Sequence, residues 1–293
     1  MNMNEEVICD YLVTAETKKL WAQLIEIYKV IEDICDRNGI KFWADGGTNL
    51  GAARHHGFIP WDDDLDLAMP IDDYERFIEV CKDELKPPYF LQTCFTEPGY
   101  PPYHLKIRKD GTTGITNWEL EMCPEGHRGI FVDIFPLYNI PDDDALYYKY
   151  MKKIDKFKFK FSCYQVDRAI KKYGVKKTKY KAKMQLMWKF YSLFTTPEKI
   201  CRDLLNFCKF QDNSSRRIGF VTMRDLYFDR EWFDNLIDVP FEDTTIRVAE
   251  KFPVILDRNF GDWHKLVKND AMHSDLHFSC EIPYQEYLKN LNK

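Results

Sequence analysis

The 293-residue sequence has no run of about 18 consecutive apolar residues, the length that a membrane-spanning helix needs. Its first residues, Met1 to Glu6, are acidic and lack the basic and then apolar layout of a secretory signal peptide. The nine cysteines are odd in number and form no C-x-x-C pair, so we favour reduced thiols over a structural zinc site. Together these absences predict a cytoplasmic protein.

Glycine and proline are almost missing from residues 142–210, where only Gly174 and Pro197 occur. Because both residue types interrupt helices, their scarcity predicts a helical insertion. Between Met151 and Phe190 there are 14 Lys and Arg against two Asp, a local charge of +12 in a chain whose net charge is −5.

This positive segment, 151–190, alternates lysine with aromatic residues over 152–161. Such a stretch can lie on an anionic membrane surface or bind a polyanionic acceptor. The alternative is a helical bundle with lysine outside and aromatic side chains inside. We expect the segment to meet a lipid-linked or polyanionic glycan at the inner face of the membrane, as a peripheral contact, and nucleic acid is the less favoured partner.

Carboxylates occupy alternate positions in the run Asp62-Asp63-Asp64-Leu65-Asp66-Leu67. In a β-strand, Asp64 and Asp66 would share one face, with Asp62 joining them if the extended conformation begins there. Two carboxylates roughly 5 Å apart repel by about 3 kcal/mol at an effective dielectric constant of ~20, and a bound Mg²⁺ or Mn²⁺ removes that cost. The alternative is a solvated acidic turn that needs no ion.

A glycine pair precedes these acids. Gly46-Gly47-Thr48 follow the apolar run 40–44, which predicts a buried strand, and precede a helix expected over Leu50–His55. Glycine lets the backbone approach a ligand closely, and a helix start offers N–H groups to an anion. A glycine turn, a helix and an acidic strand in this order are typical of nucleotidyltransferases.

The run G-G-T-N-L-G-A-A-R-H-H-G-F-I-P-W-D-D-D-L-D closely resembles the LicD family, which includes bacterial phosphocholine transferases and the fukutin-related phospho-alditol transferases. The resemblance implies an α+β fold, a nucleotidyltransferase-like mixed sheet flanked by helices. It also implies transfer of a substituted phosphate from a CDP-linked donor, CDP-choline above all, to a hydroxyl of a cell-surface glycan or its lipid-linked precursor, with Mg²⁺ or Mn²⁺.

Basic residues alternate in a second strand-like segment. Asp110-Gly111 between two β-prone runs, 103–108 and 112–117, predicts a hairpin. Alternation places His104, Lys106 and Arg108 on one face, where a lysine and an arginine suit a diphosphate. The alternative is a solvated hairpin face; the LicD-like pattern favours function for Lys106 and Arg108 and leaves His104 undecided.

Asp133 interrupts the apolar run 129–137 and is costly to bury without a partner. The family resemblance, which includes D-I-F-P at this point, implies a third-site carboxylate that is either a metal ligand or the base for the acceptor hydroxyl. The alternative is a structural aspartate paired with Arg128 or another cation.

The predicted organisation is a catalytic core over 1–141, the basic insertion over 142–210, and a C-terminal part over 211–293 that completes the catalytic domain. In that last part, 239–248 predicts a hairpin, and Phe260-Gly261-Asp262-Trp263 resembles a LicD element in which Asp262 is either a ligand-side acid or a turn residue.

The predicted site therefore has two sets of residues. The expected metal ligands are Asp62, Asp64, Asp66 and Asp133, and the expected donor-phosphate contacts are Gly46, Gly47, Thr48, Arg54, Lys106 and Arg108. Trp61 and Trp118 are candidates for contact with a choline group. Two other functions stay open: transfer of an NMP from an NTP, and non-catalytic binding of a glycan or polyanion.

Overall fold

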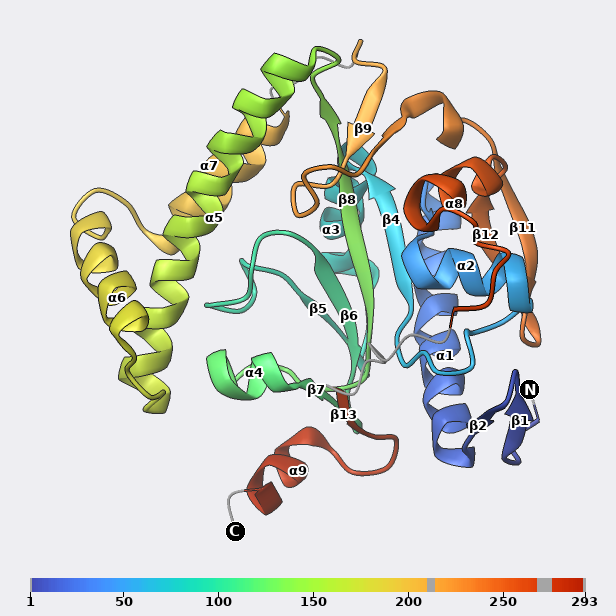
Figure 1. The fold of residues 1–293 in the computed structure, drawn as a ribbon. Coiled ribbons are helices and arrows are strands. Elements are labelled where there is room, and N and C mark those ends of the chain that lie inside the picture. Colours follow the sequence, from blue (N-terminus) through green and yellow to red (C-terminus); the bar gives the residue numbers. More distant parts are fainter. Residues whose placement is uncertain (1, 210–213, 268–275, 292–293) are drawn as a thin grey trace.

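The computed structural model describes residues 2–209, 214–267 and 276–291, and it confirms the α+β class (Figure 1). At its centre is a mixed sheet in which β8 (Phe131–Ile140) pairs with β4 on one edge and with β6 and β9 on the other. β4 and β8 run parallel, and the other pairs in this sheet run antiparallel. The further strands of this sheet are β3 (Trp43–Ala44), β4 (Asp66–Pro70), β5 (Tyr89–Gln92), β6 (Leu105–Lys109), β9 (Arg217–Gly219) and β10 (Tyr227–Asp229).

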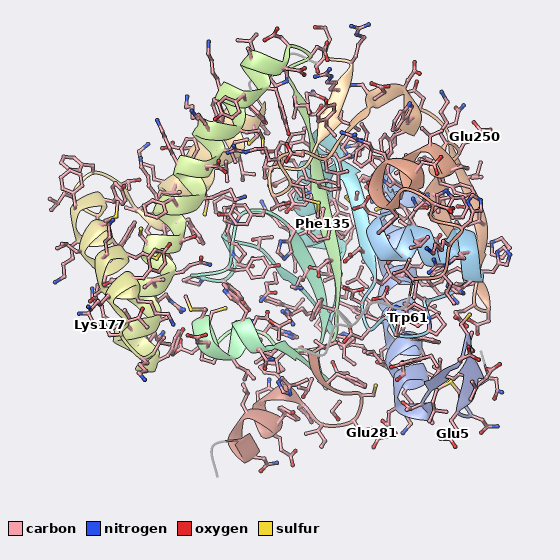
Figure 2. The ribbon with its side chains drawn as sticks, in the orientation of Figure 1. Glu5, Trp61, Phe135, Lys177, Glu250 and Glu281 are labelled. Atoms are coloured by element: carbon pink, nitrogen blue, oxygen red, sulfur yellow. The ribbon has the colours of Figure 1, made fainter. Side chains whose placement is uncertain are left out.

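Three helices occupy the segment predicted to be helical: α5 (Asp144–Tyr173), α6 (Lys179–Tyr191) and α7 (Pro197–Lys209). They stand on the left in Figure 1, and Lys177, in the connection between α5 and α6, lies at the outer edge of the molecule (Figure 2). α5 and α7 also reach the main core, to which they contribute Tyr150, Ile154 and Leu204. No helix of the described residues is both long and apolar enough to cross a membrane.

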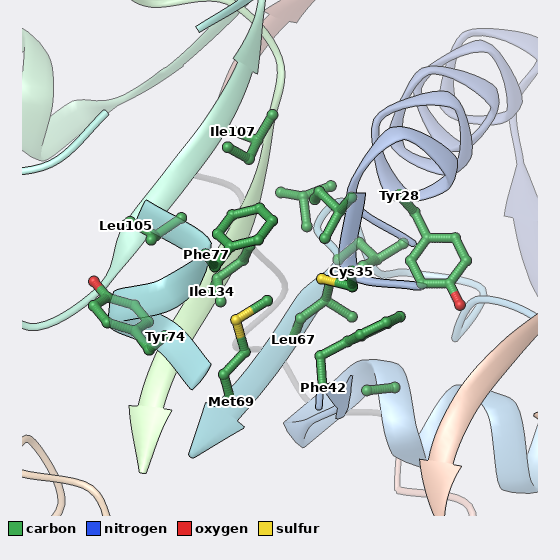
Figure 3. Close-up of a cluster of buried hydrophobic side chains, with 14 of the residues drawn as sticks. Tyr28, Cys35, Phe42, Leu67, Met69, Tyr74, Phe77, Leu105, Ile107 and Ile134 are labelled. Atoms are coloured by element: carbon green, nitrogen blue, oxygen red, sulfur yellow. The ribbon is translucent and has the colours of Figure 1, made fainter. Parts of the chain in front are cut away.

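The main core lies between one face of the sheet and the helices α1 (Ala15–Asn38) and α3 (Ile71–Glu84). The Thr14 side chain caps the start of α1, and Gly39, with φ of 60°, ends the helix. α3 begins at Ile71 and has Asp72 and Asp73 in its first turn. The sheet contributes alternate apolar residues of β4, β6 and β8 to this core, among them Leu67, Met69, Leu105, Ile107 and Ile134 (Figure 3).

α2 (Gly46–His55) begins four residues earlier than predicted, because the glycine pair belongs to the helix itself. Asp45 precedes it in an extended conformation, and Gly46 takes a φ of 50°, which a glycine adopts without strain. Thr48 then fixes the helix to the sheet, since its Oγ1 accepts a hydrogen bond of 2.8 Å from the backbone N–H of Asp66. The glycine turn and the helix are therefore one element, and its first turn contacts the start of β4.

The predicted hairpin over 103–117 is wrong. β6 pairs with β5 and β8, whereas β7 (Thr113–Thr116) pairs with β13 (Leu276–Ser279). After the turn at Asp110-Gly111, the Thr112 hydroxyl donates to Lys109 O and accepts from Ile130 N, and Gly114 N donates to Arg128 O. These bonds hold the chain beside residues 128–130 and away from β6.

The second predicted hairpin is confirmed: β11 (Leu236–Phe241) and β12 (Thr244–Ala249) pair antiparallel around Glu242 and Asp243. The remaining described elements are β1 (Glu6–Ile8), β2 (Tyr11–Val13), α4 (Asn117–Met122), the 3-10 helix η1 (Arg230–Phe233), α8 (Phe252–Phe260) and α9 (Tyr284–Leu291).

Substitution of Gly51 tests the close packing of α2. A Cβ at this position would lie 2.5 Å from the backbone oxygen of Gly57, where the chain folds back over the helix. Ala normally stabilises a helix interior relative to Gly, but here we expect Gly51→Ala to lower the free energy of unfolding by about 1–3 kcal/mol, because the backbone must shift. Urea unfolding followed by circular dichroism measures the change, and equal or greater stability would contradict the packing described.

Candidate functional site

Charged side chains lie side by side across three neighbouring strands. Asp66 of β4 is the register partner of Asp133 in the parallel strand β8, and Asp133 lies opposite Lys106 in the antiparallel strand β6. Partners in register point to the same face of a sheet, so these three side chains share the face opposite the main core. Regular pairing of β4 begins at Asp66, but Leu65 O already accepts a bond of 3.1 Å from Asp133 N, and Leu65 and Leu67 are both buried in the core as predicted.

A second group of carboxylates lies in the loop before β4. The side chains of Asp62, Asp63 and Asp64 place carboxylate oxygens within 4.8 Å of one another. Asp62 is almost buried, and its backbone oxygen accepts a hydrogen bond of 2.8 Å from the Trp21 indole of α1, which fixes the loop. Asp63 is missing from the predicted ligands, because strand alternation would have put it on the other face.

The carboxyl groups raise one another's pKa. Burial, followed by the charges of Asp64 and Asp63, raises the pKa of Asp62 above its usual range. Burial, followed by the charges of Asp64 and Asp133, raises the pKa of Asp66 well above its usual range. Burial also raises the pKa of Asp45, at the start of α2, to about 6. A crowded, desolvated set of oxygen ligands is a fitting site for a hard divalent cation, which favours their charged forms.

The glycine pair makes room for these carboxylates. A Cβ at Gly47 would lie 2.8 Å from Asp62 Oδ2, and a Cβ at Gly46 would lie 3.7 Å from Asp66 Oδ2. The first turn of α2 therefore sits directly against the acids, where its partial positive charge favours anions. Contact of Gly46 and Gly47 with a donor phosphate stays a prediction, and the Thr48 hydroxyl is already used by Asp66 N.

Asp133 has two cationic or potentially cationic neighbours. Lys106 Nζ lies 2.8 Å from Asp133 Oδ2 and 3.3 Å from the centre of the Phe131 ring. His104 Nε2 lies 3.5 Å from Oδ1, which has no hydrogen-bond partner among the described residues. Burial lowers the pKa of His104 to about 4, so its ring is neutral at pH 7. The partner of Asp133 is thus Lys106, which fits the alternative of a pairing with a cation, although that cation is not Arg128.

Arg108 lies on the same face of β6 as Lys106, as predicted, but it is buried inside the protein. Its side chain is fully buried; it donates to Gln92 Oε1 and to the backbone oxygens of Gly114 and Gly129 at 2.7–2.9 Å, and it forms an ion pair with Glu119. In this structure it cannot reach a bound phosphate, so the predicted contact is not supported. The reason is that the chain after β6 returns over this face rather than forming a hairpin.

Arg54 is likewise separated from the acids. It lies in the last turn of α2, about 12 Å along the helix from Gly46 at 1.5 Å per residue. Its guanidinium donates to the backbone oxygens of Trp263 and Lys265 at 3.3 and 3.4 Å. Asp262, in the same segment, is exposed and lies 3.7 Å from His264, which fits a turn residue.

The two tryptophans proposed for choline contact lie in different places. Trp61, which is labelled in Figure 2, directly precedes the aspartates. Its ring lies at a centroid distance of 6.0 Å from the Tyr11 ring. Trp118 is 40% exposed on α4. A further aromatic set, which no sequence pattern indicates, surrounds His104 beside Asp133. The His104 ring is 5.3 Å from the Tyr100 ring and 5.2 Å from the Phe135 ring.

Comparison with known proteins finds a family match over part of the chain. Residues 39–164 match the model of the LicD/FKTN/FKRP nucleotidyltransferase domain. Over these residues the chain is similar to the LicD family. The matched segment contains the glycine pair, the aspartates, Lys106 and Asp133, and it extends past residue 142 into α5.

Three LicD-family relatives illustrate the range of the similarity. The chain is 29% identical to lipopolysaccharide cholinephosphotransferase LicD of Haemophilus influenzae over 251 residues, which cover 83% of this chain and 89% of that protein. It is 40% identical over 50 residues to human ribitol 5-phosphate transferase FKRP, covering 17% of this chain and 10% of the relative. It is 32% identical over 114 residues to mouse ribitol-5-phosphate transferase FKTN, covering 39% and 20%. These similarities support a transferase.

The carboxylates make the metal-free protein sensitive to pH. Because burial and neighbouring charges raise the pKa of Asp62, the folded state holds its proton at pH values where the unfolded chain has lost it. Stability therefore falls as the pH rises above the ordinary aspartate value near 4. In the presence of a chelator, the unfolding free energy of the wild type should fall between about pH 5 and pH 8. We expect this fall to be about 1–3 kcal/mol larger for the wild type than for Asp62→Asn.

Urea unfolding at these pH values measures that difference. Asp203→Asn, which changes a half-exposed carboxylate on α7, is the control and should keep the wild-type slope. Mn²⁺ should restore wild-type stability at the higher pH. Identical pH slopes for wild type and Asp62→Asn would show that this carboxyl group is not destabilised when ionised.

Proposed function

We propose that this chain transfers a substituted phosphate, phosphocholine from CDP-choline, to a hydroxyl of a cell-surface glycan or its lipid-linked precursor. The observation that carries the proposal is the meeting of Asp66, Asp133 and Lys106 on one face of the sheet, beside the Asp62–Asp64 loop. The family match and the relative named a lipopolysaccharide cholinephosphotransferase support the reaction class. We place the reaction in the cytoplasm, at the inner face of the membrane.

The aspartates would hold a divalent cation. Asp62, Asp63 and Asp64 offer oxygens close enough to share one ion, and Asp66 adds a carboxylate at the start of β4. A bound Mg²⁺ or Mn²⁺ would supply charge neutralisation at the donor's diphosphate. The chain's own contribution is to fix Asp66 on β4 beside β8, with the loop carboxylate of Asp62 next to the first turn of α2.

Lys106 and Asp133 would serve the two reacting groups. The Lys106 ammonium, held over Phe131 and beside Asp133, gives the site a positive charge for the donor phosphates. The Asp133 carboxylate would accept the proton of the acceptor hydroxyl. That hydroxyl oxygen then bonds to the choline-bearing phosphorus as the bond to the CMP oxygen breaks, and CMP leaves with the electron pair.

Loss of the Asp64 or the Asp66 carboxylate should stop the reaction. We expect Asp64→Asn and Asp66→Asn each to lower metal-dependent release of CMP from CDP-choline by at least about 100-fold, because placed charge and position provide most of the catalysis. Chromatographic detection of CMP, with CDP-ribitol and CDP-glycerol as parallel donors and a glycan acceptor present, measures the activity and the donor preference.

Asp203→Asn is the matched control and should keep wild-type activity, while circular dichroism checks that all variants are folded. Retained turnover in both active-site variants would refute the site assignment. Release of pyrophosphate from an NTP would favour NMP transfer instead, and glycan binding that needs neither metal nor nucleotide would favour a non-catalytic binding protein.

A further inference from the structure

Large apolar side chains are exposed together on α6 and the turn that follows it. Leu186 is 68% exposed, Phe190 61%, Leu193 73% and Phe194 70%, and we call these four residues the α6 patch. The opposite side of α6 is buried: Met184 and Trp188 pack against α5 and α7. The Phe190 and Phe194 rings meet at 5.4 Å, so the helix and the turn form one continuous surface. α6 lies at the outer left of the molecule in Figure 1.

The chain around this patch carries only positive charge. Residues 168–197 contain nine Lys and Arg and no Asp or Glu. Lys179 and Lys183 precede Leu186 and Phe190 at spacings of three and four residues, which places all four on one face of the helix. Both lysines are exposed, and no ion pair of either is found among the described residues.

The neighbouring basic stretch on α5 differs in the direction of its aromatic side chains. Phe161 is buried, and Phe157 packs against Phe207 of α7 at a centroid distance of 6.0 Å. The segment 152–161 therefore matches a bundle with lysine outside and aromatic residues largely inside, which was the alternative considered from its sequence. Most of the unpartnered apolar surface in the basic segment 151–190 lies on α6.

We propose that the α6 patch inserts between the headgroups of an anionic lipid bilayer while Lys179 and Lys183 contact the lipid phosphates. Apolar side chains bordered by lysines on one helix face are suited to the interface of a charged membrane. Charge also argues against a second copy of this chain as the occupant. A two-fold contact would bring the same patch, with its lysines, against itself, and no acidic residue of 168–197 could compensate. This inference goes beyond the transfer reaction and does not require it.

Vesicle sedimentation with the full chain tests the proposal. We expect wild type to bind vesicles of phosphatidylcholine and phosphatidylglycerol in equal parts, to bind pure phosphatidylcholine weakly, and to dissociate at high salt. Phe190→Ser/Phe194→Ser should lower the partition coefficient at least about tenfold through lost apolar contact. Lys179→Glu/Lys183→Glu should lower it at least about tenfold through lost attraction.

Matched controls separate the patch from general surface effects. Val7→Ser/Leu12→Ser removes two similarly exposed apolar residues on β1 and β2, and Lys86→Glu/Lys251→Glu makes the same change in net charge elsewhere. Both should bind as wild type does. No binding by wild type, or equal loss in patch and control variants, would overturn the proposal. So would a wild-type dimer, seen by light scattering, that Phe190→Ser/Phe194→Ser converts to a monomer without affecting vesicle binding.

Discussion

The parallel pairing of β4 with β8 is the constraint on which the site depends. Its register sets Asp66 beside Asp133 on the face of the sheet that points away from α1 and α3. Two carboxylates roughly 5 Å apart repel by about 3 kcal/mol at an effective dielectric constant of ~20, and the loop before β4 adds three more. A fold that gathers these charges needs a compensating charge at the same place.

Several features of the chain offset part of this repulsion. Lys106 lies directly opposite Asp133, and the first turn of α2 lies against Asp62 and Asp66, where two glycines leave room for their oxygens. Burial raises the pKa of Asp66 and Asp62, so protonation also relieves repulsion when no cation is bound. Binding of a divalent cation here would therefore be coupled to the release of protons from the same carboxyl groups.

Periodicity predicts the parts of this site that lie on strands. The alternation of Leu65, Asp66 and Leu67, and that of Lys106 with Leu105 and Ile107, is enough to assign these side chains to opposite faces of the sheet. Asp64, which the alternation places on the strand with Asp66, lies instead in the loop before β4. Asp133 stands out because an acid within an apolar strand needs a partner, although that partner is Lys106 rather than Arg128.

Periodicity does not predict the roles of residues that depend on the path of a loop or on contacts distant in sequence. Asp63 joins the acidic group because the loop before β4 is not extended, and Asp45 because it begins α2. Alternation puts Arg108 on the face expected to hold phosphate. No local pattern shows that residues 112–114 return beside 128–130 and bury the Arg108 side chain. Arg54 was placed by motif alone, and only the tertiary fold shows that it binds the segment at Trp263.

The most direct test of this account is a crystal structure with Mn²⁺ and a cytidine nucleotide, in which anomalous scattering locates the metal. The account predicts a manganese peak bound by carboxylate oxygens of the Asp62–Asp66 segment, with the nucleotide's phosphates on the Lys106 side of Asp133. A manganese peak elsewhere, with the oxygens of Asp62, Asp64 and Asp66 facing only solvent, would contradict it.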